Sequence, residues 1–523
     1  MSDTVKNPVI NADFPDPDVI RVGDTYYMAS TTMFLMPGGD ILESKDLAHW
    51  KISGHVFDTI GDEDEYLLKN GRHAYARGMW APSLTYNKGK FYLNFACNER
   101  KHSLLYIADD PHGPWERTEM GDFYYDSSLF FDDDERVYIV HGNTTLKLTE
   151  LDPLTWGPKE GGLERILAVD EKDQPLGYEG SHLYKIDGKY YLFTCHMPKE
   201  TDGRKTEVCF MADSLTGDFK GKTILNDCMG YNRPALQVAQ GGLVDDEQGH
   251  LYMFMFQDRG AIGRAPVIFP MRFGEDGYPM PDTEDGHIPA LFSGVPEVSV
   301  SDPEPRGKIF GDDDFNYSSL DEMLGNAPWW QISHNPDKEN CGIARGGRAY
   351  YIRTSAVTDN LLQARNTLTQ RCMGPVSEGE ITLDASGLNI GDYAGLCAYS
   401  AHYGAIAVTK DEEGYKLVTL EVEAGTFFKD TEFYGKKPCI KTVAKLDDPV
   451  IRLRVRTDFT EEPDRCTYAY RLGNEWMDIA DVHNMYFRLD LFIGCRFALF
   501  AYSTKEPGGE AMFTDFTINV YDN

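Results

Sequence analysis

Three carboxylic acids in the first 180 residues hold similar places in a repeated pattern. Asp16, Asp126 and Glu179 each open a short run that leads, 11 or 12 residues later, to an aromatic strand. Glycoside cleavage needs two carboxyl groups on opposite sides of a pocket, because one protonates the leaving oxygen while the other activates water or attacks directly. A third acid nearby can raise the pKa of the proton donor, since like charges disfavour ionisation. The three acids therefore predict a site for glycoside cleavage.

The same pattern occurs five times in the first 260 residues. Its aromatic strands contain Tyr27, Tyr92, Tyr138, Tyr191 and Tyr252. Counting back 11 or 12 residues from these tyrosines gives Asp16, Trp80, Asp126, Glu179 and Gln240. A strand- and turn-rich repeat with a spacing of 46 to 65 residues is typical of propeller blades. Equivalent positions of all blades face one axis, so we expect these five residues to converge there.

The acid of the first repeat has neighbours that compete for its role. Asp16 lies in the run Asp13-Phe14-Pro15-Asp16-Pro17-Asp18. The two prolines restrict the backbone and can hold a carboxylate rigidly at the start of a strand. A solvated turn would use the same residue types, and Asp13 and Asp18 are alternatives. The offset to Tyr27 selects Asp16.

Aromatic side chains near the predicted axis could stack on a sugar ring. Trp80, the second converging residue, and Phe34, which lies near the first blade in sequence, are the candidates. Plain core packing is the alternative for Trp80. Gln240 completes the set of converging residues as a further predicted substrate contact.

The second part of the chain follows a different pattern. The repeat stops after residue 273, and a turn-rich and proline-rich connection follows, so we place a domain boundary near residue 305. Residues 306–523 contain seven or more separate strands without a blade repeat, which is typical of a two-sheet sandwich. The predicted fold is all-β, with a five-bladed β-propeller over residues 1–305 followed by a β-sandwich.

Composition and charge exclude several function classes. The 523 residues carry a net charge of −33, which argues against nucleic acid as a partner because phosphate binding needs a basic footprint. No 18 apolar residues run together, so we expect no membrane span, and the first residues lack the apolar core of a signal peptide. The ten cysteines form no CxxC or Cys/His cluster, so reduced thiols in a cytoplasmic protein are expected.

Several motifs together resemble glycoside hydrolase family 43. They include Phe14-Pro15-Asp16-Pro17-Asp18, Trp80-Ala81-Pro82-Ser83 and Glu179-Gly180-Ser181-His182. The block Gln240-Gly241-Gly242-Leu243-Val244, followed by residues 257–264, is similar to the β-xylosidase and α-L-arabinofuranosidase branch. Residues 364–371, 391–396 and 500–504 resemble the concanavalin-A-like, jelly-roll sandwich appended to those enzymes.

The resemblance implies an inverting propeller hydrolase. Asp16 would be the general base, Glu179 the general acid, and Asp126 the acid that tunes Glu179 and orients the substrate. Arg264 would position the sugar or a neighbouring carboxylate. Inversion predicts acid and base carboxyls roughly 6.5–9.5 Å apart, which leaves room for a water molecule. A small pocket closed at one end would release single terminal pentoses.

The chain departs from the family pattern at two positions. Related enzymes commonly carry His where this chain has Ala239, and often carry His where it has Arg259. An axial histidine of the family can bind a central calcium ion, so Ala239 argues against that ion and the metal ligands are left unassigned. We expect no required cofactor. Arg259 either supplies a fixed positive charge, which would lower nearby carboxylate pKa values, or is a surface change.

The leading functional prediction is an exo-acting hydrolase that removes terminal β-1,4-linked xylose from xylo-oligosaccharides. α-L-Arabinofuranosidase activity on arabinoxylan fragments, alone or in the same pocket, is the alternative, because the two pentoses present similar hydroxyls. A non-catalytic carbohydrate-binding propeller is a third hypothesis. The sandwich could be a structural partner or an independent carbohydrate-binding module, and a homo-oligomer is left open.

Overall fold

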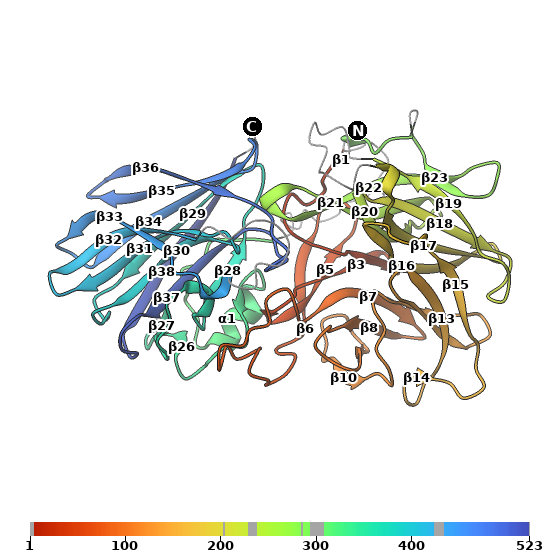
Figure 1. Cartoon of the computed structure of the whole chain (residues 1–523), viewed down its shortest axis with the longest axis horizontal. Helices are drawn as coiled ribbons and strands as arrows, with labels where there is room; N and C mark the ends of the chain where they lie inside the picture. The colour runs from red at the N-terminus through yellow and green to blue at the C-terminus, as the bar shows by residue number, and fades with distance from the viewer. Residues whose placement is uncertain are drawn as a thin grey trace.

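The computed structural model describes residues 5–201, 204–227, 238–283, 286–292, 308–422 and 433–521. These residues form two β-rich bodies side by side, the first drawn from red to yellow-green and the second from green to blue (Figure 1). The predicted all-β fold of a five-bladed propeller and a β-sandwich is confirmed. The predicted boundary near residue 305 lies outside the described residues.

Five antiparallel sheets make the blades of the propeller, each ordered from the axis outward in chain order. The first two blades are β2 (Asp18–Val22), β3 (Thr25–Ser30), β5 (Gly38–Ser44) and β6 (Lys51–Phe57), then β7 (Trp80–Asn87), β8 (Lys90–Ala96), β9 (Leu104–Ala108) and β10 (Glu116–Glu119). The third is β11 (Ser128–Phe131), β12 (Val137–His141), β13 (Thr145–Asp152) and β14 (Gly157–Pro158), with β15 (Glu164–Val169) also on β13. The last two are β16 (Leu176–Ile186), β17 (Lys189–Met197), β18 (Thr206–Ala212) and β19 (Lys220–Leu225), then β20 (Val238–Asp245), β21 (Leu251–Asp258), β22 (Arg264–Phe273) and β23 (Pro279–Pro281). A short pair, β1 (Val5–Lys6) with β24 (Leu291–Phe292), lies beside them.

Tight turns join the inner strands of the blades. Asp187 and Gly188, between β16 and β17, both have positive φ, as do Lys88 and Gly89 between β7 and β8. Positive φ at both central residues defines the type I′ turn, whose twist matches that of paired strands. Residue chemistry at these positions therefore sets the pairing register of the blades.

Two sheets form the sandwich. The first is β33 (Cys439–Leu446), β32 (Gly414–Glu421), β31 (Gly404–Asp411), β30 (Asp392–Tyr399), β37 (Arg496–Ser503), β28 (Leu368–Arg371), β25 (Gln331–Ser333) and β4 (Leu35–Met36). The second is β26 (Cys341–Ile343), β27 (Tyr350–Arg353), β38 (Glu510–Tyr521), β29 (Val376–Asp384), β34 (Val450–Asp458), β35 (Asp464–Leu472) and β36 (Glu475–Met485). The short helical elements are α1 (Leu320–Asn326), η1 (Lys199–Thr201), η2 (Gly260–Ile262), η3 (Leu361–Gln363) and η4 (Phe433–Gly435). In the described part of the chain, no helix has the length and apolar character needed to cross a bilayer.

The two bodies share one sheet edge and one core. Strand β4 follows blade-one strand β3 in the chain, yet it pairs with β25 of the sandwich through Met36 and Ile332. A single buried apolar cluster contains Phe14 and Trp50 of the propeller together with Phe497 of the sandwich. This packing favours a structural partner over an independent module.

A buried ionic network fastens the same junction. Arg371 places Nη2 2.6 Å from Asp40 Oδ2 and donates through Nε to the Asp13 carbonyl. Gln331 donates to the other oxygen of Asp40 and accepts from Arg496. Asp40 and Arg371 are almost fully buried, so each charge depends on the other for compensation.

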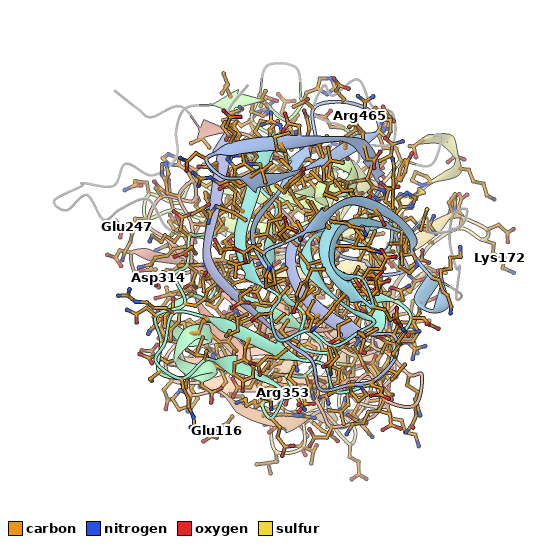
Figure 2. The ribbon with its side chains drawn as sticks, turned by 90° about the vertical axis from the view of Figure 1, so that its left-hand side faces the viewer. Glu116, Lys172, Glu247, Asp314, Arg353 and Arg465 are labelled. Carbon is orange, nitrogen blue, oxygen red and sulfur yellow. The ribbon has the colours of Figure 1, made fainter. Side chains whose placement is uncertain are left out.

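The remaining charge lies mainly on the surface. Figure 2 shows exposed charged side chains around the outline of the molecule, among them Glu116, Lys172, Glu247, Asp314, Arg353 and Arg465. The nine described cysteines are free thiols, and eight of them are buried. The described residues thus agree with the prediction of reduced cysteines.

Replacement of Asp40 tests the junction. Asp40→Ala leaves Arg371 buried without its partner, so we expect the free energy of unfolding in urea to fall by about 3–5 kcal/mol. Asp24→Ala, which removes an exposed partner of Lys45, is the matched control and should leave the unfolding midpoint unchanged. Equal midpoints for the two variants would contradict a junction that depends on Asp40.

Candidate active site

A left-handed backbone kink marks the start of each inner strand. Strand pairing places Ile20, Thr85, Phe130, Tyr184 and Val244 opposite the five repeat tyrosines. Four residues before each of these lie Asp16, Ala81, Asp126, Gly180 and Gln240, whose φ angles are 50°, 34°, 43°, 68° and 57°. Four of the five are not glycine, and such angles are uncommon in residues with a side chain. The conformation itself repeats around the axis, where kinks and bulges re-aim side chains.

The register corrects two of the five converging residues. Trp80 and Glu179 lie one residue before the kink, because the first hairpins of blades three and five are one residue longer than those of the other blades. A count of 12 is therefore right for Asp126 and Gln240, whereas 11 is right elsewhere. Asp16 and Asp126 occupy the kink itself.

Asp16 is fixed by two donors. Thr31 Oγ1 donates to its Oδ2 at 2.8 Å, and Arg264 Nη1 donates to its Oδ1 at 2.8 Å. Both Asp16 and Arg264 are buried, so this is a charge-assisted contact away from bulk water. The arrangement suits an ionised carboxylate held in one orientation.

The two competing acids of the first repeat have other partners. Asp13 accepts backbone N–H bonds from Arg264 and from Gly494 of the sandwich. Asp18 accepts from the Leu84 N–H and lies 3.5 Å from His182 Nδ1. Asp13 thus joins the two bodies and Asp18 joins blades.

Glu179 has an environment that favours a proton. Asn143 Nδ2 donates to its Oε2 at 2.8 Å, and the Tyr125 hydroxyl lies 3.4 Å from the same oxygen. Burial raises the pKa of Glu179, although Lys205 and Asn143 oppose this rise. A carboxyl with a raised pKa can carry the proton that a leaving group needs.

Asp126 is the most deeply buried of the three acids. Burial, together with the charges of Glu179 and Asp16, raises the pKa of Asp126 well above its usual range. The three acids therefore share one electrostatic cluster, as the repeat predicted. Asp126 and Glu179 compete for protons, so the tuning is mutual rather than a one-way effect on Glu179.

Aromatic rings from both bodies stand beside the acids. Trp80 is half-buried, with its ring centroid 5.3 Å from that of Phe492 and 6.3 Å from that of Tyr125. Phe492 belongs to the loop between β36 and β37 of the sandwich, and the Arg264 guanidinium lies 4.4 Å from its ring centroid. The sequence analysis did not find Phe492, because its contact with Trp80 spans more than 400 residues and has no local signature.

The structure places Phe34 in the core, away from any sugar. Its side chain is fully buried, with Tyr75 at 4.7 Å and His334 at 5.0 Å between ring centroids. Because it has no exposed surface, the predicted stacking by Phe34 is not supported. Gln240 does lie beside the acids, since a Cβ added to Gly180 would come within 2.5 Å of its Cγ.

The residues along the axis do not fit a calcium site. Ser83 and Ser128 accept N–H bonds from Leu129 and Leu183 of the next blades, just as Asp18 does from Leu84. Calcium needs six to eight oxygen ligands. No group of three or more His, Cys, Asp or Glu side chains that could hold a metal occurs among the described residues.

The two departures from the family pattern differ in what the structure describes. The side chain of Ala239 lies outside the described side chains. Arg259 donates to Gln257 Oε1 at 3.3 Å, and Gln257 is fully buried. Arg259 is thus attached to strand β21 and is more than a surface change.

Comparisons with known proteins match this architecture. A family model for glycosyl hydrolases family 43 covers residues 5–279, and one for the β-xylosidase C-terminal concanavalin A-like domain covers residues 312–519. A β-xylosidase of Formosa agariphila is 25% identical over 97% of this chain and 88% of its own length. A xylosidase/arabinosidase of Butyrivibrio fibrisolvens is 29% identical over 57% of this chain and 59% of its own.

Solved structures agree over the whole length. A bifunctional GH43-CE protein of Bacteroides eggerthii has a TM-score of 0.89 and 34% identity over 100% of this chain, which spans 64% of that longer protein. A GH43 enzyme engineered to display endo-xylanase and exo-arabinofuranosidase activity has a TM-score of 0.86 and 26% identity, over 99% of this chain and 100% of its own. With its propeller and its sandwich both matched, the chain belongs to glycosyl hydrolases family 43 and is a glycoside hydrolase.

Proposed function

We propose that this glycoside hydrolase is an inverting exo-β-xylosidase, which removes terminal β-1,4-linked xylose from xylo-oligosaccharides. The observation that carries the proposal is the cluster of Asp16, Asp126 and Glu179 at the kinked strand starts, with contrasting surroundings. Asp16 is paired with a cation, whereas burial favours a proton on Glu179. Inversion needs this pairing of an ionised base with a protonated acid.

The contacts of each acid support separate roles. Asp16 accepts hydrogen bonds from Thr31 and Arg264, which leave lone pairs free to take a proton from an attacking water. Glu179 would pass its proton to the departing sugar oxygen, with Asn143 and Tyr125 holding the carboxyl in place. Asp126, deep in the cluster, would keep its proton and donate to a sugar hydroxyl.

The loop that carries Phe492 supports attack at chain ends. Its backbone is tied to the propeller by the bonds from Ala76 N–H to the Leu491 carbonyl and from Gly494 N–H to Asp13. Phe492 is thereby held against Trp80, where it stands as a wall across the site. A walled pocket takes terminal sugars, whereas an open groove would take internal ones.

α-L-Arabinofuranosidase activity is the second candidate, alone or in the same pocket. Relatives named xylosidase/arabinosidase and non-reducing end α-L-arabinofuranosidase match over more than half of this chain. Trp80 and Phe492 present apolar faces, which both pentoses can meet. The cytoplasmic location and a homo-oligomer stay predictions.

Rates on two nitrophenyl pentosides, measured with acid and base variants, test the proposal. We expect faster release from the β-xyloside than from the α-arabinofuranoside, and losses of about 100- to 10,000-fold in kcat for Asp16→Asn and Glu179→Gln. Glu179→Gln should lose less on a dinitrophenyl xyloside, since a good leaving group needs little protonation, whereas Asp16→Asn should lose as much as before.

Glu200→Gln, an exposed acid after the same strand β17, is the control and should keep the wild-type rate. Wild-type rates in both active-site variants would reject the assigned acid and base. Equal rates on the two pentosides would reject an exclusive xylosidase.

We also propose that activity needs no calcium, because the axial oxygens are occupied by bonds between blades. Dialysis against EDTA should leave kcat and the thermal midpoint unchanged, and added calcium should not raise either. A loss of activity that calcium alone restores would contradict this part of the proposal.

A further inference from the structure

Lys205 is a mostly buried lysine that neither the repeat nor the family motifs single out. It directly precedes β18, the third strand of the blade that carries Glu179. Pairing aligns Glu179 with Cys195 on β17, and Cys195 with Glu207 on β18. Lys205 lies two residues before Glu207, and side chains two residues apart along a strand share a face. Lys205 is thus on the Glu179 face of this blade.

The same ring supports Lys205 and the known cation of the site. Lys205 Nζ lies 5.1 Å from the centroid of Phe256, and Arg264 Cζ lies 5.5 Å from it. Both distances are within the usual range for attraction between a cation and an aromatic face. Two positive charges therefore stand beside one wall of the acid cluster, the second being 17% exposed.

The charge of Lys205 reaches the acids. It opposes the effect of burial on both Glu179 and Asp126, so that it lowers the pKa of each below the value that burial alone would give. Although its own burial disfavours the charged form, Asp258 and Glu179 raise the pKa of Lys205, so the ammonium stays charged. Its Nζ is 3.9 Å from Asp258 Oδ2.

The other groups around Lys205 leave the charge balance of the cluster unchanged. Burial raises the pKa of Glu207 and of Cys195 well above their usual ranges, so both are neutral. Burial also raises the pKa of Tyr125, which is neutral as well. Asp258 and Arg259 are neighbours in the chain and bring opposite charges.

Counting the remaining charges gives a simple result. Asp16, Asp126 and Glu179 would carry three negative charges if all were ionised, while Arg264 and Lys205 carry two positive ones. One proton on the three acids makes the buried cluster neutral, and buried charge without compensation is costly. Inverting hydrolysis also needs one acid protonated and one ionised.

We propose that Lys205 is a positioning residue of the active site, which together with Arg264 holds the three carboxyls at a single proton. The proposal rests on the function proposed above. Lys205 acts through the acids, because its positive charge sets how many protons they bind. Without this charge, the cluster takes up a second proton at neutral pH and the general base is lost.

The pH profile of kcat/KM for Lys205→Met and Lys205→Arg tests this role. Removing a positive charge makes every carboxyl of the cluster bind protons at higher pH, so both limbs of the Lys205→Met profile should move upward by about one pH unit or more. Lys205→Arg keeps the charge and should keep the wild-type limbs. Lys185→Met, in the same blade and paired with Asp132 at the surface, is a control that should not shift them.

Thermal midpoints at pH 5 and pH 8 give a readout that does not need turnover. Carboxyls whose pKa is higher in the folded state bind more protons folded than unfolded, so they lower stability as pH rises from the unfolded to the folded pKa. Lys205→Met raises the folded pKa values further, so its midpoint should fall more between pH 5 and pH 8 than that of Lys205→Arg.

The outcomes separate the two proposals. A wild-type enzyme without pentosidase activity would reject the proposed function, and the midpoints would then decide on Lys205 alone. An active wild type whose limbs and midpoint differences are unchanged in Lys205→Met, even with a lower rate at every pH, would reject the role of Lys205 and leave the function standing.

Discussion

The structure depends on Arg264, which is buried at the junction of the last blade, the first blade and the sandwich. Its guanidinium pairs with Asp16, its backbone N–H donates to Asp13, and its carbonyl accepts from the Phe14 N–H. Blade five is thereby closed against blade one at the place where the general base is held. Because a buried arginine needs its carboxylate, closure of the propeller and placement of the base are one event.

The sandwich completes the site as well as the core. Gly494 brings the loop of Phe492 so close to the propeller that a Cβ there would lie 2.1 Å from the Ile262 carbonyl oxygen. Phe492 then covers Arg264 and faces Trp80. Without the sandwich, the ion pair of Arg264 and Asp16 would lose one wall and meet water, which weakens it. The accessory body is therefore part of the catalytic architecture.

Local patterns in the sequence predict the propeller well, and contacts that are distant in sequence explain the misses. The five aromatic strands and their turns locate the blades, and Asp16 and Asp126 fall at the kinks. Trp80 and Glu179 are displaced by one residue, because hairpin length cannot be read from tyrosine spacing. Phe34 is close to blade one in sequence, but strand β4 carries the chain into the sandwich and buries it. Phe492 and Lys205 have no motif, since only folding brings them to the acids.

The central claim is that a water held by Asp16 attacks while Glu179 protonates the departing oxygen. The anomeric form of the first product reports this directly, because a water attacking opposite the leaving group inverts the anomeric carbon. Time-resolved proton NMR of xylobiose hydrolysis should show α-xylose from the released non-reducing end before mutarotation adds the β form. β-Xylose as the first product from that end would contradict the account, since retention requires a carboxylate that attacks the sugar itself.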